Sequence, residues 1–183
     1  PRAGLLVGVD SGPGMLEAFA SRAEVAAVDH REVAGQWPDV AAACPAADVV
    51  VCHHVLYNVA ELIPFSYALT ARARERVVVE LTGVHPLVWM APIWEGIHGS
   101  PRPRGPSADD ASQALRDAGI NLRQTTWRRP FTLAQGTEDA VVFLRRRLCV
   151  GADRDAEIRA LLAEHPPPDE REVATLWWDG AAT

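Results

Sequence analysis

Residues 5–10 read LLVGVD, an apolar run that ends in an acid, and the turn residues SGPG follow directly at 11–14. Apolar runs of this length bounded by Gly and Pro are typical of strands buried on both faces, as in parallel sheets. Two more such runs follow, DVVVC at 48–52 and VVVEL at 77–81. These three segments indicate a parallel sheet at the centre of the fold.

Helical segments are expected between the strands. Apolar spacing and helix start or stop residues predict helices at 15–23, 39–43, 63–74, 107–118, 138–148 and 153–164. Weaker strands are expected at 25–33, 120–127 and 173–178. Strands that alternate with helices predict an α/β fold with a doubly wound sheet, and right-handed crossovers then place helices on both of its faces.

The composition fits one globular domain over residues 1–183 and excludes several classes of protein. Of the residues, 48% are hydrophobic and 23% are charged, as in ordinary globular proteins. The net charge of −6 predicts no nucleic-acid partner, and the 18 basic residues are all arginine, which excludes a catalytic lysine. Three scattered cysteines predict neither a zinc site nor a disulfide framework, so we expect a cytoplasmic protein. No stretch approaches the ~20 apolar residues of a membrane helix, so no membrane partner is expected.

The position of Asp10 suggests a ligand site. Ligands of open α/β sheets bind outside the carboxyl ends of the strands, and a carboxylate at a strand tip can accept two hydrogen bonds from a ribose diol. An aspartate before a turn can equally bond its own backbone. Both interpretations remain open from the residues alone.

Four segments resemble class I S-adenosylmethionine-dependent methyltransferases. GVDSGPGML at 8–16 is similar to the family's second strand and the turn after it, and ADVVVCHHVLYNV at 47–59 to its fourth strand and following loop. VVVELTG at 77–83 resembles the fifth strand, and WWDG at 177–180 a late antiparallel strand. The resemblance implies a Rossmann-like, mostly parallel sheet with an antiparallel last strand. It also implies S-adenosylmethionine as cofactor and methyl transfer to a small-molecule acceptor.

The resemblance assigns cofactor-binding residues as well. Asp10 would hold the ribose hydroxyls, with Ser11 beside it in the same motif, and Met15 would lie against the adenine. The family's third strand usually ends in an acid near the adenine amino group. Gln36 stands there instead, with an amide that can both accept and donate. Trp37 would stack on the base or, alternatively, pack in the core.

The loop after residues 48–52 supplies the candidate catalytic residues. The resemblance places this loop beside the methionine part of the cofactor, so His53 is expected to contact the cofactor. His54 and Tyr57 are the candidates for a base that removes a proton from the acceptor. Alternatively, these side chains only fix the loop by hydrogen bonds. Adjacent histidines at a strand end point in opposite directions, so no metal site is expected.

Residues 84–106 are expected to form a cap or lid within the domain. They carry Trp89, Trp94 and His98 among several prolines, without a long regular element. Aromatic side chains above a cofactor suit a moderately apolar acceptor. The alternative is that they only pack the cap onto the sheet.

The glycine-rich cofactor turn that opens such methyltransferases is missing from the sequence. Residues 1–4 are typical of the end of the helix after this turn, so we expect a sheet that is incomplete at its N-terminus, without its first strand. Two strands would then keep unpaired edges. We expect the chain to be poorly soluble or to form homo-oligomers through these edges, and to show no measurable methyl transfer.

Two other functions fit the same pattern. An acid that ends the second strand also serves NAD, which would make the chain a fragment of an NAD-dependent oxidoreductase. A Rossmann-like domain that kept its fold without the cofactor turn would be a non-catalytic binding domain. Binding of S-adenosylhomocysteine is expected only of a methyltransferase.

Overall fold

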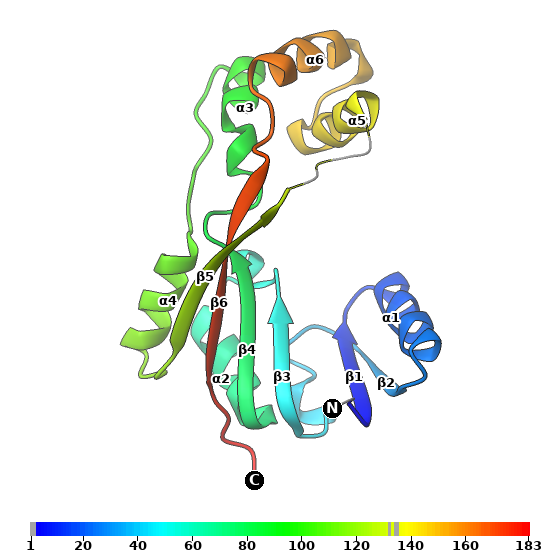
Figure 1. Ribbon diagram of the computed structural model, residues 1–183, viewed down its shortest axis with the longest axis vertical. Coiled ribbons are helices and arrows are strands. Elements are labelled where there is room, and N and C mark those ends of the chain that lie inside the picture. Colours follow the sequence, from blue (N-terminus) through cyan, green and yellow to red (C-terminus); the bar gives the residue numbers. More distant parts are fainter. Residues whose placement is uncertain (1–2, 132, 134–135) are drawn as a thin grey trace.

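The computed structural model describes residues 3–131, 133 and 136–183 (Figure 1). Its strands are β1 (Leu5–Asp10), β2 (Asp29–Ala34), β3 (Ala47–His53), β4 (Ala73–Thr82), β5 (Arg123–Pro130) and β6 (Glu170–Asp179). Its α-helices are α1 (Pro13–Val25), α2 (Leu62–Arg72), α3 (Ala91–His98), α4 (Ala108–Asp117), α5 (Thr137–Leu148) and α6 (Asp155–Glu164). The predicted strands are confirmed, with ends that shift by a few residues.

Two predictions near helices need comment. The short helix expected at 39–43 is only a 3-10 turn, Ala41–Ala43. The helix end expected at 1–4 falls partly on residues 1 and 2, which lie outside the described residues.

The strands form two groups. β3, β4, β6 and β5 make a four-stranded sheet in that order, and β1 pairs with β2 in parallel as a separate two-stranded sheet. β3 and β4 are parallel, whereas β6 is antiparallel to both of its neighbours, β4 and β5. The predicted α/β fold with a mostly parallel sheet and an antiparallel last strand is therefore confirmed.

One face of the four-stranded sheet packs against α2 and α4. Val77, Val79 and Leu81 of β4 point to this face and are at most 1% exposed. They share a core with Leu69 of α2 and Leu115 of α4. Because side chains alternate along a strand, this arrangement buries every second residue of β4 from Val77 to Leu81.

The opposite face differs from the expectation of helices on both faces. On β3, Val49 and Val51 point to this side and are 48% and 63% exposed. β3 pairs only with β4, and β1 only with β2, so each keeps one unpaired edge within the described residues. Figure 1 shows β1 next to β3 with both arrows pointing the same way. Unpaired edges beside exposed valines favour association with another chain.

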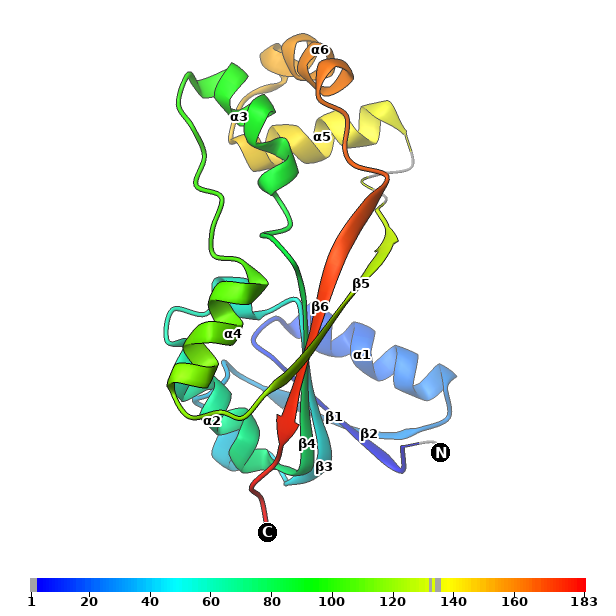
Figure 2. The same ribbon diagram turned by 60° about the vertical axis from the view of Figure 1, so that its left-hand side comes forward.

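α3, α5 and α6 form a second layer at one end of the sheet, here called the helical cap (Figures 1 and 2). The helical cap has its own core, in which Ile93, Leu144, Leu148 and Ile158 are fully buried. The segment 84–106, expected as a cap, supplies α3 and the 3-10 turn Val88–Met90 before it, whose Met90 lies in the same core. The other two helices come from much later in the chain.

Trp89, Trp94 and His98 of the segment 84–106 contact other rings or the backbone. The rings of Trp94 and His98 lie 4.2 Å apart, and His98 Nε2 donates to the Leu148 carbonyl at 3.0 Å. The ring of Trp89 lies 6.1 Å from that of Phe131, which follows β5. These contacts support the packing interpretation for Trp94 and His98.

Candidate active site

One end of the sheet collects the carboxyl ends of its parallel strands. β1, β3 and β4 all end on the side of the helical cap (Figures 1 and 2). β5 runs antiparallel to β6 and therefore in the direction of β4, so it ends there as well. Ligands of open α/β sheets bind at this end. Asp10 and His53 are the last residues of β1 and β3, and Gln36 follows the end of β2.

The Asp10 side chain bonds to the backbone of its own turn, which is one of the two interpretations that the sequence left open. Its Oδ1 accepts a hydrogen bond from the Gly12 N–H at 2.7 Å. No hydrogen bond from the described residues reaches its Oδ2, which leaves that oxygen for a ligand. Ser11 is exposed, and Met15 is 63% exposed on the first turn of α1. The local turn and a bond to a ribose are therefore compatible.

The turn after β2 lies against the end of β1. The Gly35 N–H donates to the Asp10 carbonyl at 3.0 Å. Gly35 has a φ of +146°, and a Cβ at this position would collide with Val40, so the turn requires glycine. This contact brings Gln36, which is exposed, to the same end of the sheet as Asp10.

Trp37 packs against α2. Its indole N–H donates to the Phe65 carbonyl at 3.2 Å, and the two rings meet edge to face with centroids 6.5 Å apart. This is the packing alternative. The expected role of Trp37 beside an adenine stays a prediction.

The two adjacent histidines have different surroundings. His53 ends β3 and is exposed. His54 has a left-handed backbone with a φ of +57°, and its N–H donates to the Glu80 carbonyl at 2.7 Å. Left-handed backbones are uncommon outside glycine, although histidine adopts them more often than most residues. This local conformation lets the imidazole of His54 reach the end of β5.

His54 belongs to a compact polar group, here called the His54 cluster: His54, Tyr57, Glu80, Thr82 and Arg129. The Nε2 atom of His54 lies 3.2 Å from Glu80 Oε1 and 3.1 Å from Arg129 Nη2. Arg129 Nη1 lies 3.6 Å from the same Glu80 oxygen. The three charged or titratable side chains are one third exposed or less. The structure thus joins β3, β4 and β5 through side chains at the candidate site.

The surroundings of His54 favour its neutral form. Burial lowers the pKa of His54, Arg129 lowers it further, and Glu80 opposes them. When Arg129 donates to Nε2, the ring proton is on Nδ1, which faces the Tyr57 hydroxyl at 3.4 Å. In this arrangement Nε2 is the ring nitrogen with the lone pair, so His54 can act as a general base only when Arg129 releases that atom.

The Tyr57 hydroxyl bonds to Thr82 at the end of β4. It accepts from the Thr82 N–H and lies 2.9 Å from Thr82 Oγ1. Because the Thr82 hydroxyl donates to the Val84 carbonyl, Tyr57 is the donor to Thr82 Oγ1. Its only hydroxyl proton is therefore engaged. This supports the loop-fixing interpretation for Tyr57, and its role as a base stays a prediction.

Sequence reasoning missed Glu80, Thr82 and Arg129. Glu80 lies within VVVEL, which was interpreted only as an apolar strand. An acid within an apolar strand needs a partner where it is buried, so its presence is itself a signal of a polar site. The pair Arg128–Arg129 lies before a proline at a strand end, but nothing local says which strand it meets.

Other chemistry has little support in the described part of the chain. Burial raises the pKa of the Cys52 thiol to about 12, so this thiol stays protonated. Within residues 3–131, 133 and 136–183, no three His, Cys, Asp or Glu side chains are grouped to hold a metal ion. Among the described helices, none combines the length and the apolar character needed to cross a bilayer.

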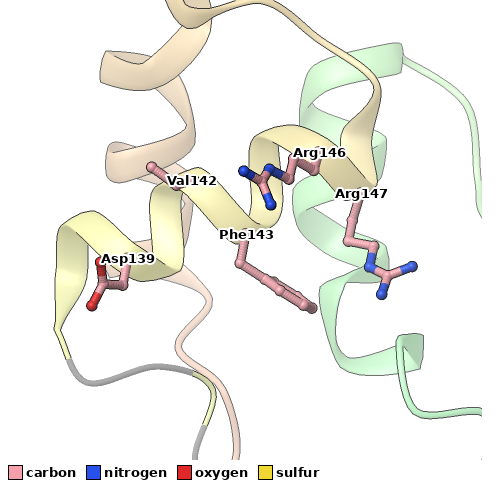
Figure 3. A pocket seen from close by; sticks show the side chains of 5 residues that line it. All are labelled: Asp139, Val142, Phe143, Arg146 and Arg147. Atoms are coloured by element: carbon pink, nitrogen blue, oxygen red, sulfur yellow. The ribbon is translucent and has the colours of Figure 1, made fainter. Parts of the chain in front are cut away.

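Two surface depressions occur, one on the helical cap and one between the end of α1 and the start of β2. The first, of about 320 Å³, is lined by Asp139, Val142, Phe143, Arg146 and Arg147, and Figure 3 shows that all five belong to α5. The second is lined by residues between Glu24 and His30. Neither includes a predicted site residue. A depression lined by a single helix has no opposing wall to enclose a ligand.

Comparison with solved structures identifies the fold. No family model and no curated protein matches the sequence. A Bacillus halodurans C-125 protein assigned as a methyltransferase matches with a TM-score of 0.62 and 14% identity, over 98% of this chain and 84% of that one. Magnesium protoporphyrin IX methyltransferase from Synechocystis PCC 6803, solved with S-adenosylhomocysteine, matches at 0.53 and 16%, over 94% and 63%. The chain has the fold of class I S-adenosylmethionine-dependent methyltransferases.

The methyltransferase fold does not by itself fix the reaction. A cyclase named SpnF matches with a TM-score of 0.53 and 14% identity, over 96% of this chain and 67% of that one. At these identities the likeness concerns the fold alone, and function depends on the residues of the site.

Proposed function

We propose that this protein is an S-adenosylmethionine-dependent methyltransferase that acts on a small-molecule acceptor. The observation that carries the proposal is the placement of Asp10, Gln36 and His54 at the carboxyl ends of three strands in a methyltransferase fold. Ligands of such sheets bind at this end. The His54 cluster supplies a neutral imidazole on the same side of the molecule.

The residues at this end fit the cofactor in part. Asp10 Oδ2 is available to a ribose hydroxyl, and Met15 and Gln36 are exposed, as contacts to an adenine require. When bound, S-adenosylmethionine would supply an activated methyl group on its sulfonium sulfur for in-line transfer to the acceptor atom, with S-adenosylhomocysteine as the leaving group. The chain's own residues then orient the two molecules, exclude water and hold the acceptor proton at His54.

We further propose that these 183 residues bind the cofactor weakly and associate with themselves. The unpaired edges of β1 and β3 and the exposure of Val51 support association. The glycine-rich turn that would donate backbone N–H groups to the cofactor was not found in the sequence. Several lost contacts of about 0.5–1.5 kcal/mol each weaken binding by orders of magnitude.

A non-catalytic Rossmann-like binding domain is the second candidate function. The local turn of Asp10 and the packing of Trp37 on α2 favour it, because both side chains already have structural partners. An NAD-dependent oxidoreductase would use the same acid but a different cofactor.

Calorimetry with S-adenosylhomocysteine and NAD tests the three functions. We expect weak binding of S-adenosylhomocysteine and no binding of NAD. Asp10→Ala should weaken the binding, whereas Asp29→Ala, at the start of β2, serves as the matched control. Binding of NAD alone would favour the oxidoreductase. No binding of either compound would leave the non-catalytic domain.

A further inference from the structure

Arg129 and Arg171 face each other on β5 and β6, where these strands reach the helical cap. They are register partners in the antiparallel pair. Directly opposite residues project to the same face of the sheet, with Cβ atoms about 5 Å apart. Glu170 and Glu172 flank Arg171 in the sequence, but strand alternation sends them to the other face. The guanidinium groups of Arg129 and Arg171 therefore lie close together, and the two acids that flank Arg171 on β6 are not on their face of the sheet.

Glu80, the acid that contacts Arg129, also contacts His54. Glu80 lies 3.6 Å from Arg129 and 3.2 Å from His54. Arg171 forms no ion pair within the described residues, and its Nε is buried without a hydrogen-bond partner. Its guanidinium lies 5.4 Å from the centroid of the Phe131 ring. A buried charged donor without a partner is costly, so this arrangement favours an additional anion.

The pKa values show the same excess of positive charge. Burial and then Arg129 lower the pKa of the Arg171 guanidinium. The pKa of His54 is lowered by burial first, and both arginines contribute to the lowering. With His54 neutral, two guanidinium groups face the single carboxylate of Glu80. One negative charge from a ligand would balance the group.

The surroundings of the arginine pair are aromatic. Phe131 packs against Trp89 with ring centroids 6.1 Å apart, and Tyr57 packs against His85 at 5.6 Å. Arginine binds carboxylates through two parallel N–H groups, and aromatic surfaces favour an apolar ligand body. A ligand that combines both features matches this part of the molecule.

We propose that Arg171, together with Arg129, binds a carboxylate group of the methyl acceptor, which is therefore an anionic small molecule with an apolar body. As an assignment of substrate class it rests on the proposed methyl transfer, because only that activity makes the bound anion an acceptor. Arg129 also contacts His54, so the bound carboxylate lies next to the candidate base. Neither arginine was among the residues predicted from the sequence.

Saturation-transfer NMR with benzoate and benzamide tests the assignment on the 183-residue chain. The two probes differ in charge and share an aromatic body, and the method tolerates self-association of the protein. We expect benzoate to bind at least tenfold more tightly than benzamide. Arg171→Gln and Arg129→Gln should each weaken benzoate binding at least tenfold. Arg128→Gln, on the next residue of β5 but on the opposite face, should leave it unchanged.

Three results would overturn the proposal. They are equal binding of benzoate and benzamide, benzoate binding that survives Arg171→Gln, and preferential binding of inorganic phosphate. Arg171→Lys keeps the charge but loses the paired N–H groups, so partial rescue by it supports the carboxylate geometry. Circular dichroism of each variant confirms that the fold is retained.

A titration of the same samples with S-adenosylhomocysteine separates this proposal from the proposed function. If benzoate binds through Arg171 and S-adenosylhomocysteine does not bind, the anion site stands and methyl transfer falls. If S-adenosylhomocysteine binds and benzoate binding is unchanged in Arg171→Gln, methyl transfer stands and the acceptor class falls.

Discussion

Replacing Tyr57 by phenylalanine removes the hydroxyl that joins the loop after β3 to the end of β4. The hydroxyl accepts from the Thr82 N–H and donates to Thr82 Oγ1, and Thr82 is only 3% exposed. In Tyr57→Phe the Thr82 N–H stays buried without that partner, whereas Thr82 Oγ1 keeps its bond to Val84. Leaving one buried donor unpaired costs about 1–3 kcal/mol, so we expect the free energy of unfolding to fall by this amount.

The other tyrosine of the chain provides a matched control. Tyr67 donates to the Ala118 carbonyl but is 50% exposed, so water can replace its hydroxyl. We expect Tyr67→Phe to cost less than about 1 kcal/mol. Urea unfolding followed by tryptophan fluorescence measures both variants. All proteins are compared at one concentration, because self-association makes the midpoint concentration-dependent.

Equal and small losses in the two variants would refute the reasoning. That result would mean that the Tyr57 hydroxyl and the Thr82 N–H are hydrated in solution, and the His54 cluster would then contact β4 through Glu80 alone. A loss in Tyr57→Phe with an unchanged slope against urea is the expected result, because the slope reports the surface exposed on unfolding.

Three more predictions concern the sheet edge, the cofactor end and His54. Val51→Lys places a charge on the exposed side of β3 and should reduce self-association, seen as a smaller mass in light scattering, whereas Val25→Lys at the 90% exposed end of α1 should not. Asp10→Ala should weaken S-adenosylhomocysteine binding by about 1–3 kcal/mol in calorimetry, the scale of hydrogen bonds to a charged group, and unchanged affinity would remove Asp10 from the site. Because the pKa of His54 is lowered in the folded chain, the unfolded chain binds more protons below about pH 6.5, so stability falls as the pH drops through this range. His54→Gln should reduce that fall in urea midpoints, with the remaining fall expected from His85, whose pKa is lowered in the same direction.

The elements that could be predicted from the sequence have local signals. LLVGVD, DVVVC and VVVEL became strands because short apolar runs between turn residues have few other solutions in a soluble protein. Ser107 caps α4 through the Asp110 N–H, a bond between neighbours that the sequence displays directly. The end of β1 at Asp10 has the same local origin.

The elements that were missed depend on contacts between distant residues. The helical cap joins Ile93 to Leu144 and Ile158, and no local pattern in 84–106 shows that it meets α5 and α6. Arg129 reaches His54 across 75 positions of sequence. Such pairings depend on strand order and register, and the periodicity of hydrophobic residues in the sequence specifies neither of them.

The two halves of the candidate site have different mechanical support. Glu80, Thr82 and the arginine pair lie on β4, β5 and β6, and His54 and Tyr57 lie in the loop after β3, in a sheet where every neighbour in the strand order is hydrogen-bonded. Asp10 and Gln36 lie on the two-stranded sheet, which no backbone pairing joins to β3 within the described residues. Backbone pairing therefore fixes the strands that carry the arginine pair, whereas Asp10 and Gln36 are linked to this sheet through side chains such as Trp37, whose indole N–H donates to the Phe65 carbonyl of α2.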